Sequence, residues 1–254
     1  MKPPSGKALF GELWDHLFAP PIAHQGYWSH PDAPANSLAA FEAACEAGYD
    51  IELDVHLSAD GEAMVFHDET LQRMTGVEGR LADHSAADLQ RMRLASSGET
   101  IPRLADVLTI VGRRSMIHIE LKTPWGEVGR LERRVCEVLI DHNGPTCVIG
   151  FNPYSHAWFA RHHPQVLRGL DSHAYRREDA PHLATEQRRA FAKLEHVHIA
   201  KPHFLALSLD MLANSAAMKL RRAGMPVIAW TVRDRSQMPP DGACDNFIFE
   251  GFAA

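Results

Sequence analysis

Tyr49-Asp-Ile-Glu-Leu-Asp-Val55 and Met116-Ile-His-Ile-Glu-Leu-Lys122 are the two stretches that decide the fold and chemistry of this chain. Both have the apolar spacing of strands, yet both carry carboxylates. Residues two apart in a strand share a face, so Glu52 and Asp54 point the same way. Burying a carboxylate is costly unless it is paired or binds a cation. Together with Glu120, they predict a divalent metal site with oxygen ligands.

Short apolar segments on either side of these stretches alternate with helical ones, as in repeated βα units. Strands are predicted at 21–25, 49–56, 63–67, 115–121, 146–151, 166–170, 196–200 and 226–232, and the run 246–249 closes the barrel or lies over it. The 254 residues, 45% hydrophobic and 23% charged, fit one domain over 1–254. Eight βα-like units of this total length predict an α/β fold, a TIM (β/α)8 barrel.

Several helix boundaries are also predictable. Asn36 or Ser37 caps a helix whose apolar positions recur at three and four residues, and Gly48 ends it. The longest interval between predicted strands begins after His67 and holds two possible short helices, at 85–92 and 102–111. We expect about 68–100 to form a small helical insertion between the third and fourth strands.

Composition narrows the choice of partners. The net charge is −6, the pI is near 6.2 and no basic run stands out, so we predict no nucleic-acid partner. The four cysteines have no CxxC spacing, which favours reduced thiols. Residues 1–6 are polar and no apolar stretch of signal-peptide length follows them. We therefore expect a cytoplasmic protein, and the sequence carries no indication of its oligomeric state.

Residues 9–18 form an apolar stripe at helical spacing. Such a stripe suits a helix packed on its own domain or one lying in a membrane interface. Its polar face lacks the lysines and arginines that interfacial helices prefer, and this favours packing on the domain. No 18 apolar residues run together, so we predict no stable membrane insertion.

Polar and aromatic side chains stand at the C-terminal ends of six predicted strands: His24, Asp54, His67, Glu120, Phe151 and Trp230. In a TIM barrel this rim forms the active site, because fixed strand ends bring distant residues together over open space. The sequence therefore predicts one site built from these positions. Other histidines, among them His156, match no such position and are expected at the surface.

Six ordered blocks of the chain resemble motifs of the glycerophosphodiester phosphodiesterase family: Ile22-Ala-His24-Gln-Gly26, Pro34-Ala-Asn36-Ser-Leu-Ala-Ala-Phe41, Ile51-Glu-Leu-Asp-Val55, Phe66-His67-Asp68-Glu-Thr-Leu71 with Arg73, Glu120-Leu-Lys122, and Trp230-Thr231. The resemblance spans almost the whole chain. It implies a TIM barrel of the phospholipase C-like phosphodiesterase type. It also implies hydrolysis of a small-molecule glycerophosphodiester to glycerol 3-phosphate and an alcohol, with one divalent cation, Mg²⁺ or Ca²⁺.

Position by position, the resemblance makes Glu52, Asp54 and Glu120 the metal ligands, and His24 and His67 the general acid/base pair. The residue types suit these roles. Hard cations prefer carboxylate oxygens, and imidazoles exchange protons near neutral pH. The alternative for the three carboxylates is a buried salt-bridge cluster.

Further residues complete the expected site. The resemblance makes Lys122 a phosphate contact, although it could instead only neutralise the carboxylates. Phe151 and Trp230 are expected to pack on the glycerol or alcohol group, with plain core packing as the alternative. His118 lies one layer below Glu120, where a supporting hydrogen bond is favoured over catalysis.

The chain departs from the family pattern at two positions. Gln25 stands where the family has arginine, and Ala35 stands where it has glutamate. A lost charged hydrogen bond costs about 1.5 to 3 kcal/mol, which is roughly 10- to 200-fold in kcat/KM. Gln25 can still hydrogen-bond a phosphate, but without charge. Either the enzyme is slower, or its substrate differs, or another residue such as His30 supplies the charge.

Two alternatives to hydrolysis remain open at this point. The reaction could stop at a cyclic phosphate, as in the related sphingomyelinase D-type toxins. The barrel could instead bind phosphodiesters with little turnover, and the two departures at Gln25 and Ala35 motivate this possibility.

Overall fold

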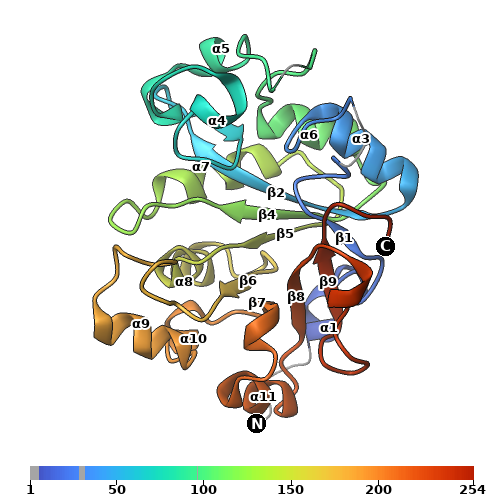
Figure 1. Ribbon diagram of the computed structural model, residues 1–254, viewed down its shortest axis with the longest axis vertical. Helices are drawn as coiled ribbons and strands as arrows, with labels where there is room; N and C mark the ends of the chain where they lie inside the picture. The colour runs from blue at the N-terminus through green and yellow to red at the C-terminus, as the bar shows by residue number, and fades with distance from the viewer. Residues whose placement is uncertain (1–5, 29–31, 96) are drawn as a thin grey trace.

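The computed structural model describes residues 6–28, 32–95 and 97–254, and the predicted TIM barrel forms its centre (Figure 1). Eight parallel strands lie side by side in the order β5-β4-β2-β1-β9-β8-β7-β6. They are β1 Ile22–Ala23, β2 Asp50–Leu57, β4 Ile117–Leu121, β5 Thr146–Ile149, β6 Gly169–Ser172, β7 Phe204–Ser208, β8 Val227–Val232 and β9 Asn246–Phe249. Backbone hydrogen bonds from Val148 to Leu167 (2.9 Å) and from Asp171 to Gly150 (3.0 Å) join β5 to β6 and close the ring.

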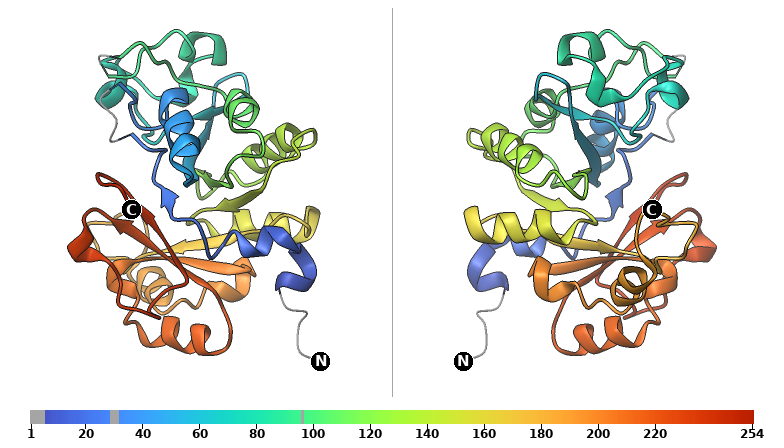
Figure 2. Two further views of the ribbon diagram at one scale, coloured as in Figure 1. Left: turned by 90° about the vertical axis from the view of Figure 1, so that its right-hand side faces the viewer. Right: turned by 90° about the vertical axis from the view of Figure 1, so that its left-hand side faces the viewer.

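Helices surround this barrel, as the two side views show (Figure 2). The α-helices are α1 Gly6–Phe10, α2 Glu12–Asp15, α3 Leu38–Ala47, α4 Gln72–Thr75, α5 Ala86–Leu89, α6 Leu104–Val111, α7 Arg130–Leu139, α8 Pro153–His162, α9 Thr185–Ala192, α10 Val197–Ala200 and α11 Ser215–Arg222. Short 3-10 turns lie at η1 Leu81–Asp83, η2 Leu209–Met211 and η3 Arg235–Gln237.

Successive side chains of β2 point alternately toward the helices outside the barrel and into the barrel interior. Ile51, Leu53 and Val55 point outward into a fully buried cluster with α3, α6 and α7. Each such side chain contributes about 1.5–3 kcal/mol by leaving water, which offsets the cost of the polar interior. Glu52 and Asp54 point the other way, into the barrel.

Helix α3 begins and ends where the sequence predicts. The Ser37 hydroxyl accepts a hydrogen bond from the Ala40 amide at 3.1 Å, as an N-cap does. Gly48 ends the helix with a φ of 75°, in the left-handed region that glycine adopts without a Cβ clash. These ends place the loop before α3, which carries Asn36, against β2.

The N-terminal end of the barrel is closed by α1 and α2. Leu17 is fully buried with interior residues of the strands, and Phe10, Leu13 and Trp14 pack on the same cluster. Most of the predicted stripe at 9–18 therefore packs on its own domain, although Leu9 and Phe18 are exposed and Gly11 breaks the stripe into two short helices. Across the described ranges, every helix is too short or too polar to cross a membrane.

Two of the predicted barrel strands were wrong. Residues 63–67 do contain a strand, β3 Ala63–Val65, but it pairs antiparallel with β2 and stays outside the ring. The connection 58–62 is too short for the crossover that a parallel pair requires. Residues 196–200 contain helix α10 instead of a strand. The ring keeps eight strands because β7, which we did not predict, and β9 take these places.

The segment between β3 and β4 holds α4, η1 and α5. It has a small apolar core of its own in which Phe66, Leu81 and Leu89 are buried. Because β3 is not a barrel strand, this segment follows the second strand of the ring and precedes the third. Helices α5 and α6 lie within the stretches 85–92 and 102–111 predicted as helical.

Candidate active site

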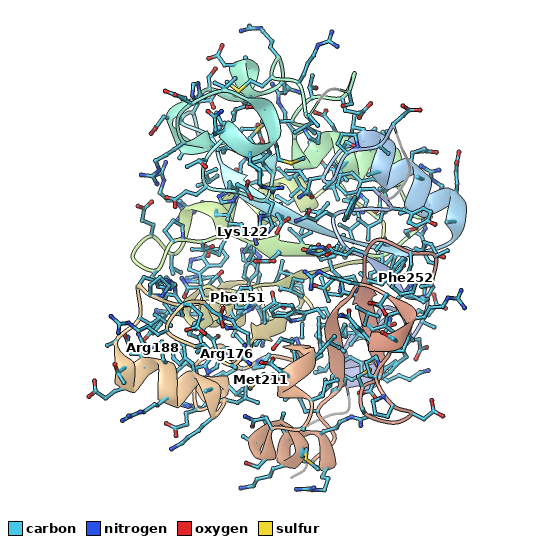
Figure 3. All side chains as sticks on the ribbon, viewed as in Figure 1. Lys122, Phe151, Arg176, Arg188, Met211 and Phe252 are labelled. Atoms are coloured by element: carbon cyan, nitrogen blue, oxygen red, sulfur yellow. The ribbon has the colours of Figure 1, made fainter. Side chains whose placement is uncertain are left out.

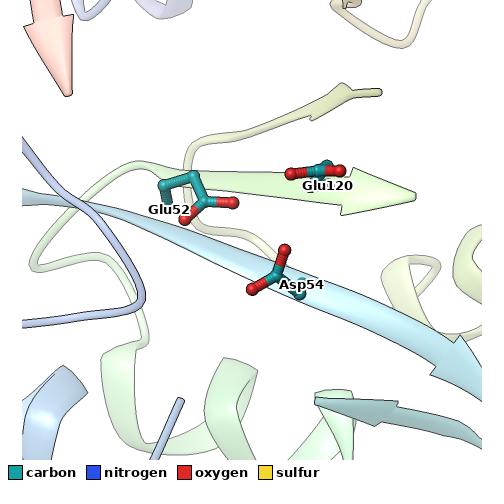
Figure 4. A group of neighbouring side chains, drawn as sticks. All are labelled: Glu52, Asp54 and Glu120. Carbon is teal, nitrogen blue, oxygen red and sulfur yellow. The ribbon is translucent and has the colours of Figure 1, made fainter. Parts of the chain in front are cut away.

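Three buried carboxylates meet inside the barrel, as predicted (Figure 4). Asp54 and Glu120 are register partners on β2 and β4, and Glu52 lies two residues before Asp54. One oxygen from each lies within 4.8 Å of the others. Glu52 Oε1 is buried without a hydrogen-bond partner among the described residues. An all-oxygen donor set with an unsatisfied buried oxygen fits a hard divalent cation.

Lys122 lies beside two of these carboxylates. Its Nζ is 2.8 Å from Asp54 Oδ1 and 2.6 Å from Glu120 Oε1. Burial alone would lower the pKa of Lys122, but the two anions outweigh burial and raise it. The ammonium is therefore held charged between Asp54 and Glu120.

The carboxylates differ in how well their charge is compensated. Burial raises the pKa of Glu52 well above its usual range, and repulsion from Asp54 and Glu120 adds to this. Burial also raises the pKa of Glu120, against the opposing effect of Lys122. Burial opposes ionisation of Asp54 too, but Lys122, His67 and His24 together outweigh burial and lower the pKa of Asp54. The site thus holds more anionic groups than it compensates, as a cation site requires.

Two neutral amides support Asp54. The side-chain nitrogens of Gln25 and Asn36 donate to Asp54 Oδ2 at 2.9 and 2.8 Å. The Gln25 backbone N–H donates to Glu52 Oε2 at 3.1 Å. Gln25 has a φ of 57°, and this left-handed backbone directs both of its donors to the carboxylates. In this arrangement the Gln25 amide contacts Asp54, and its predicted contact with phosphate stays a prediction.

His24 follows β1 and lies at the edge of the carboxylate group. Its Nε2 is 3.9 Å from Glu52 Oε2, and its Nδ1 is 2.5 Å from Glu250 Oε2. The other oxygen of Glu250 forms an ion pair with Arg233, with 2.6 Å between Oε1 and Nε. The hydrogen bond with His24 lowers the pKa of Glu250, so this carboxylate is anionic at neutral pH.

His67 follows β3 and has a similar partner. Its Nδ1 is 2.7 Å from Asp68 Oδ1. Arg73 holds Asp68 through Nε at 2.5 Å and Nη2 at 2.8 Å, and this hydrogen bonding lowers the pKa of Asp68. Each of the two histidines therefore has Nδ1 engaged by an anionic carboxylate, and Nε2 lies outside that contact.

A cavity of about 190 Å³ joins these groups. Its lining includes seven of the predicted residues: His24, Glu52, His67, Glu120, Lys122, Phe151 and Trp230. The rings of Phe151 and Trp230 meet edge to face with centroids 5.7 Å apart and form one wall. A second depression, of about 510 Å³, shares Glu120, Lys122 and Phe151 with the cavity. Figure 3 labels Lys122 and Phe151 among the side chains.

The sequence interpretation missed three lining or supporting residues. Asp171 lines the cavity from β6, and burial raises its pKa well above the usual range. Arg233 lines it one residue after β8, and Glu250 stands one residue after β9. All three could have been found by applying the strand-end rule to the correct strand ends.

Two histidines differ from expectation. His156 is fully buried, not at the surface, and its Nε2 lies 2.8 Å from the Gly150 carbonyl oxygen. His118 is buried with Nδ1 3.2 Å from Cys147 Sγ, and its Nε2 has no hydrogen-bond partner in the described ranges. Burial lowers the pKa of His118 to about 3, so it is neutral. His30 lies outside the described residues.

Solved structures of known proteins share this fold. The structure of an Oleispira antarctica phosphodiesterase in complex with the product sn-glycerol-3-phosphate superposes with a TM-score of 0.78, over 95% of this chain and 96% of that one, at 24% identity. A Thermotoga maritima glycerophosphodiester phosphodiesterase gives 0.70, over 90% and 92%, at 23% identity. Both support the barrel architecture.

Sequence relatives point to the same group of proteins. A glycerophosphodiester phosphodiesterase of Caldanaerobacter subterraneus subsp. tengcongensis is 33% identical over 159 residues, 59% of this chain and 65% of that protein. One of Bacillus altitudinis is 40% identical over 125 residues, 46% of this chain and 50% of that protein. The chain thus spans about half to two thirds of the length of these relatives. The pattern of the Glycerophosphoryl diester phosphodiesterase family matches residues 24–240, and the chain therefore belongs to this family.

Proposed function

We propose that this protein hydrolyses glycerophosphodiesters to glycerol 3-phosphate and an alcohol, with one divalent cation, Mg²⁺ or Ca²⁺. The observation that carries the proposal is the pairing of both cavity histidines with carboxylates, on either side of the three buried carboxylates. Membership of the family supports it. The Oleispira antarctica neighbour, which was solved with sn-glycerol-3-phosphate as product, supports the choice of product.

Glu52, Asp54 and Glu120 would hold the cation. Bound there, it would withdraw charge from a phosphate oxygen and ease nucleophilic attack on phosphorus. Lys122 would then share its two carboxylate partners with the cation and turn part of its charge toward the phosphate. Gln25 and Asn36 keep Asp54 in place, because two amide donors fix the orientation of its carboxylate.

His24 and His67 carry the proton transfers. Glu250 and Asp68 fix the two rings through Nδ1 and stabilise each imidazole when it is protonated. One Nε2 accepts the proton of the nucleophile, and the other donates a proton to the leaving alkoxide. Such proton transfer contributes roughly 10² to 10⁴ in rate. Phe151 and Trp230 exclude water on one side and pack on the carbon skeleton.

The test follows release of glycerol 3-phosphate from a panel of glycerophosphodiesters with Mg²⁺, Ca²⁺ or EDTA, with His24→Ala in parallel. We expect metal-dependent release that His24→Ala abolishes. Phosphorus NMR of the products separates complete hydrolysis from a cyclic phosphate end product. Tight binding of the diesters without turnover, at saturating metal, would contradict the proposal.

A further inference from the structure

Few of the described residues that line the 190 Å³ cavity carry a positive charge that could bind a substrate phosphate. The family pattern has arginine at the position of Gln25, but the Gln25 amide donates to Asp54. Lys122 lies between Asp54 and Glu120, so only part of its charge is left for the phosphate. Among the described residues that line the cavity, the remaining permanently charged cation is Arg233.

Arg233 has free donors. Its Nε lies 2.6 Å from Glu250 Oε1, an ion pair, and among the described residues no other acidic side chain pairs with this guanidinium. The guanidinium carries five N–H donors in a planar fork that matches a phosphate. The Arg233 side chain is 60% exposed, so its terminal nitrogens can reach a ligand in the cavity. Arg233 follows β8, which β9 separates from β1 in the strand order, whereas Gln25 reaches Asp54 of β2 on the other side of β1.

We propose that Arg233 binds the substrate phosphate and supplies the charge that the family pattern places at position 25. This assignment rests on the proposed function. In this arrangement the Glu250 carboxylate orients two side chains: Oε1 orients Arg233 and Oε2 orients His24. One carboxylate thus sets the spacing between the phosphate contact and a proton-transfer group.

The experiment compares Arg233→Gln with Arg235→Gln, a matched control. Arg235 lies in η3, and its Nη2 donates to the Ala253 carbonyl away from the cavity. We expect Arg233→Gln to raise KM and to weaken glycerol 3-phosphate binding, measured by calorimetry, by roughly 10- to 100-fold. The control keeps wild-type values, and circular dichroism verifies that both variants fold.

A second set of variants returns the positive charge to position 25. Adding Gln25→Arg and Ala35→Glu to Arg233→Gln should restore at least part of the glycerol 3-phosphate affinity. Unchanged binding in Arg233→Gln overturns the assignment even if the wild-type protein is active. A wild-type protein that binds glycerol 3-phosphate through Arg233 but releases none from any diester would overturn the proposed function alone. No binding by metal-loaded wild-type protein overturns both.

The 510 Å³ groove beside the cavity carries a second inference. It lies between the η1 segment and the loop after β4, and it shares Lys122 with the cavity. The 190 Å³ cavity is smaller than a usual ligand pocket of about 300–1,000 Å³, whereas the groove falls within that range. We infer that the groove holds the alcohol half of the diester, an inference that also rests on the proposed function.

The lining of the groove indicates what kind of alcohol fits. It carries charges of both signs: Glu69, paired with Arg80 at 2.8 Å, then Asp83, Glu127 and Arg130. Trp125 adds an apolar wall. The three acidic residues outnumber the two basic ones, which disfavours a second phosphate. Closely spaced donors and acceptors suit hydroxyl groups, and a quaternary ammonium has no N–H or O–H to pair with them. The inferred leaving group is an uncharged polyol.

Kinetics with glycerophosphoinositol, glycerophosphocholine and the methyl ester of glycerol 3-phosphate test this. We expect kcat/KM for the inositol ester to exceed that for the choline ester at least tenfold. Arg80→Ala should lower kcat/KM for the inositol ester and leave kcat/KM for the methyl ester unchanged. Arg91 is on the same segment but outside the groove, so Arg91→Ala should change kcat/KM for neither ester. Equal rates for all esters in wild type, or equal losses in Arg80→Ala, would overturn the groove assignment. Inactivity toward the methyl ester as well would count against the proposed function.

Discussion

Glu250 Oε2 lies 2.5 Å from Nδ1 of His24, although 226 residues of chain separate the two. The contact exists because β9 pairs with β1 and completes the ring, with Ala23 and Phe249 in register. Pairing of β9 with β1 therefore closes the barrel and also places Glu250 against the His24 imidazole.

Replacing Glu250 by glutamine tests that contact. Glu250→Gln keeps the side-chain shape but removes the negative charge that stabilises a protonated His24. We expect kcat to fall by roughly 10- to 100-fold, since general acid/base catalysis contributes about 10² to 10⁴. Metal affinity, measured by calorimetry, should stay at the wild-type value because Glu250 is outside the group of three carboxylates and is separated from Glu52 by the His24 ring. An unchanged kcat would show that the contact is structural only.

Lys122 can be tested through the cation. Because its ammonium neutralises Asp54 and Glu120, Lys122→Met should leave these carboxylates free to bind a cation more strongly. We expect Ca²⁺ and Mg²⁺ affinity to rise about tenfold and KM for the diester to rise as well. Calorimetry and steady-state kinetics separate the effects. Tighter cation binding with an unchanged KM would show that Lys122 only neutralises the carboxylates and does not contact the phosphate.

Gly26 sets the backbone beside His24. It has a φ of 81°, and an added Cβ would lie 2.9 Å from the Ala40 backbone carbon. Gly26→Ala therefore combines left-handed strain of about 1–2 kcal/mol with a clash of about 1–3 kcal/mol. Gly61, with a φ of 83° and open space around it, is the control and should show the strain alone. Urea unfolding measures both, and equal losses would exclude the clash.

Asp50 predicts a pH dependence of stability. Burial raises its pKa to about 7, against a backbone hydrogen bond from Met116. A carboxyl whose pKa rises on folding destabilises the native state as pH climbs from the unfolded to the folded pKa. Asp50→Asn removes this penalty, so its advantage in unfolding free energy should grow by about 3 kcal/mol between pH 5 and pH 8. Urea titrations at both pH values check it, and a constant difference would contradict the raised pKa.

The motif-bearing residues were predictable because strand geometry alone places them. Alternation in β2 and β4 puts Glu52, Asp54 and Glu120 on one face, and the structure brings them together. His24 stands just after a barrel strand, where such groups collect. His67 lines the cavity as well, but it follows β3, which pairs antiparallel with β2 outside the ring, so the strand-end rule does not account for it. Short-range rules were enough for the three carboxylates and His24.

Residues that depend on exact strand ends were not predictable. Asp171 was missed because the predicted strand 166–170 stops one residue short of it, whereas β6 runs from Gly169 to Ser172. Glu250 was missed because a four-residue apolar run can be a barrel strand or a covering segment, and only ring closure decides. The runs 196–200 and 204–208 are both short and apolar, and neither has a local signal that separates helix from strand.

Because β9 is synthesised long after β1, their pairing also depends on the order of synthesis. Ribosomes add about 5–20 residues per second, so Glu250 is made roughly 10 to 45 s after His24. The three clustered carboxylates are all made by residue 120, in the first half of the chain. A nascent chain therefore carries all three carboxylates well before the partner of His24 exists, and the pairing of His24 with Glu250 forms only after the final strand has been made.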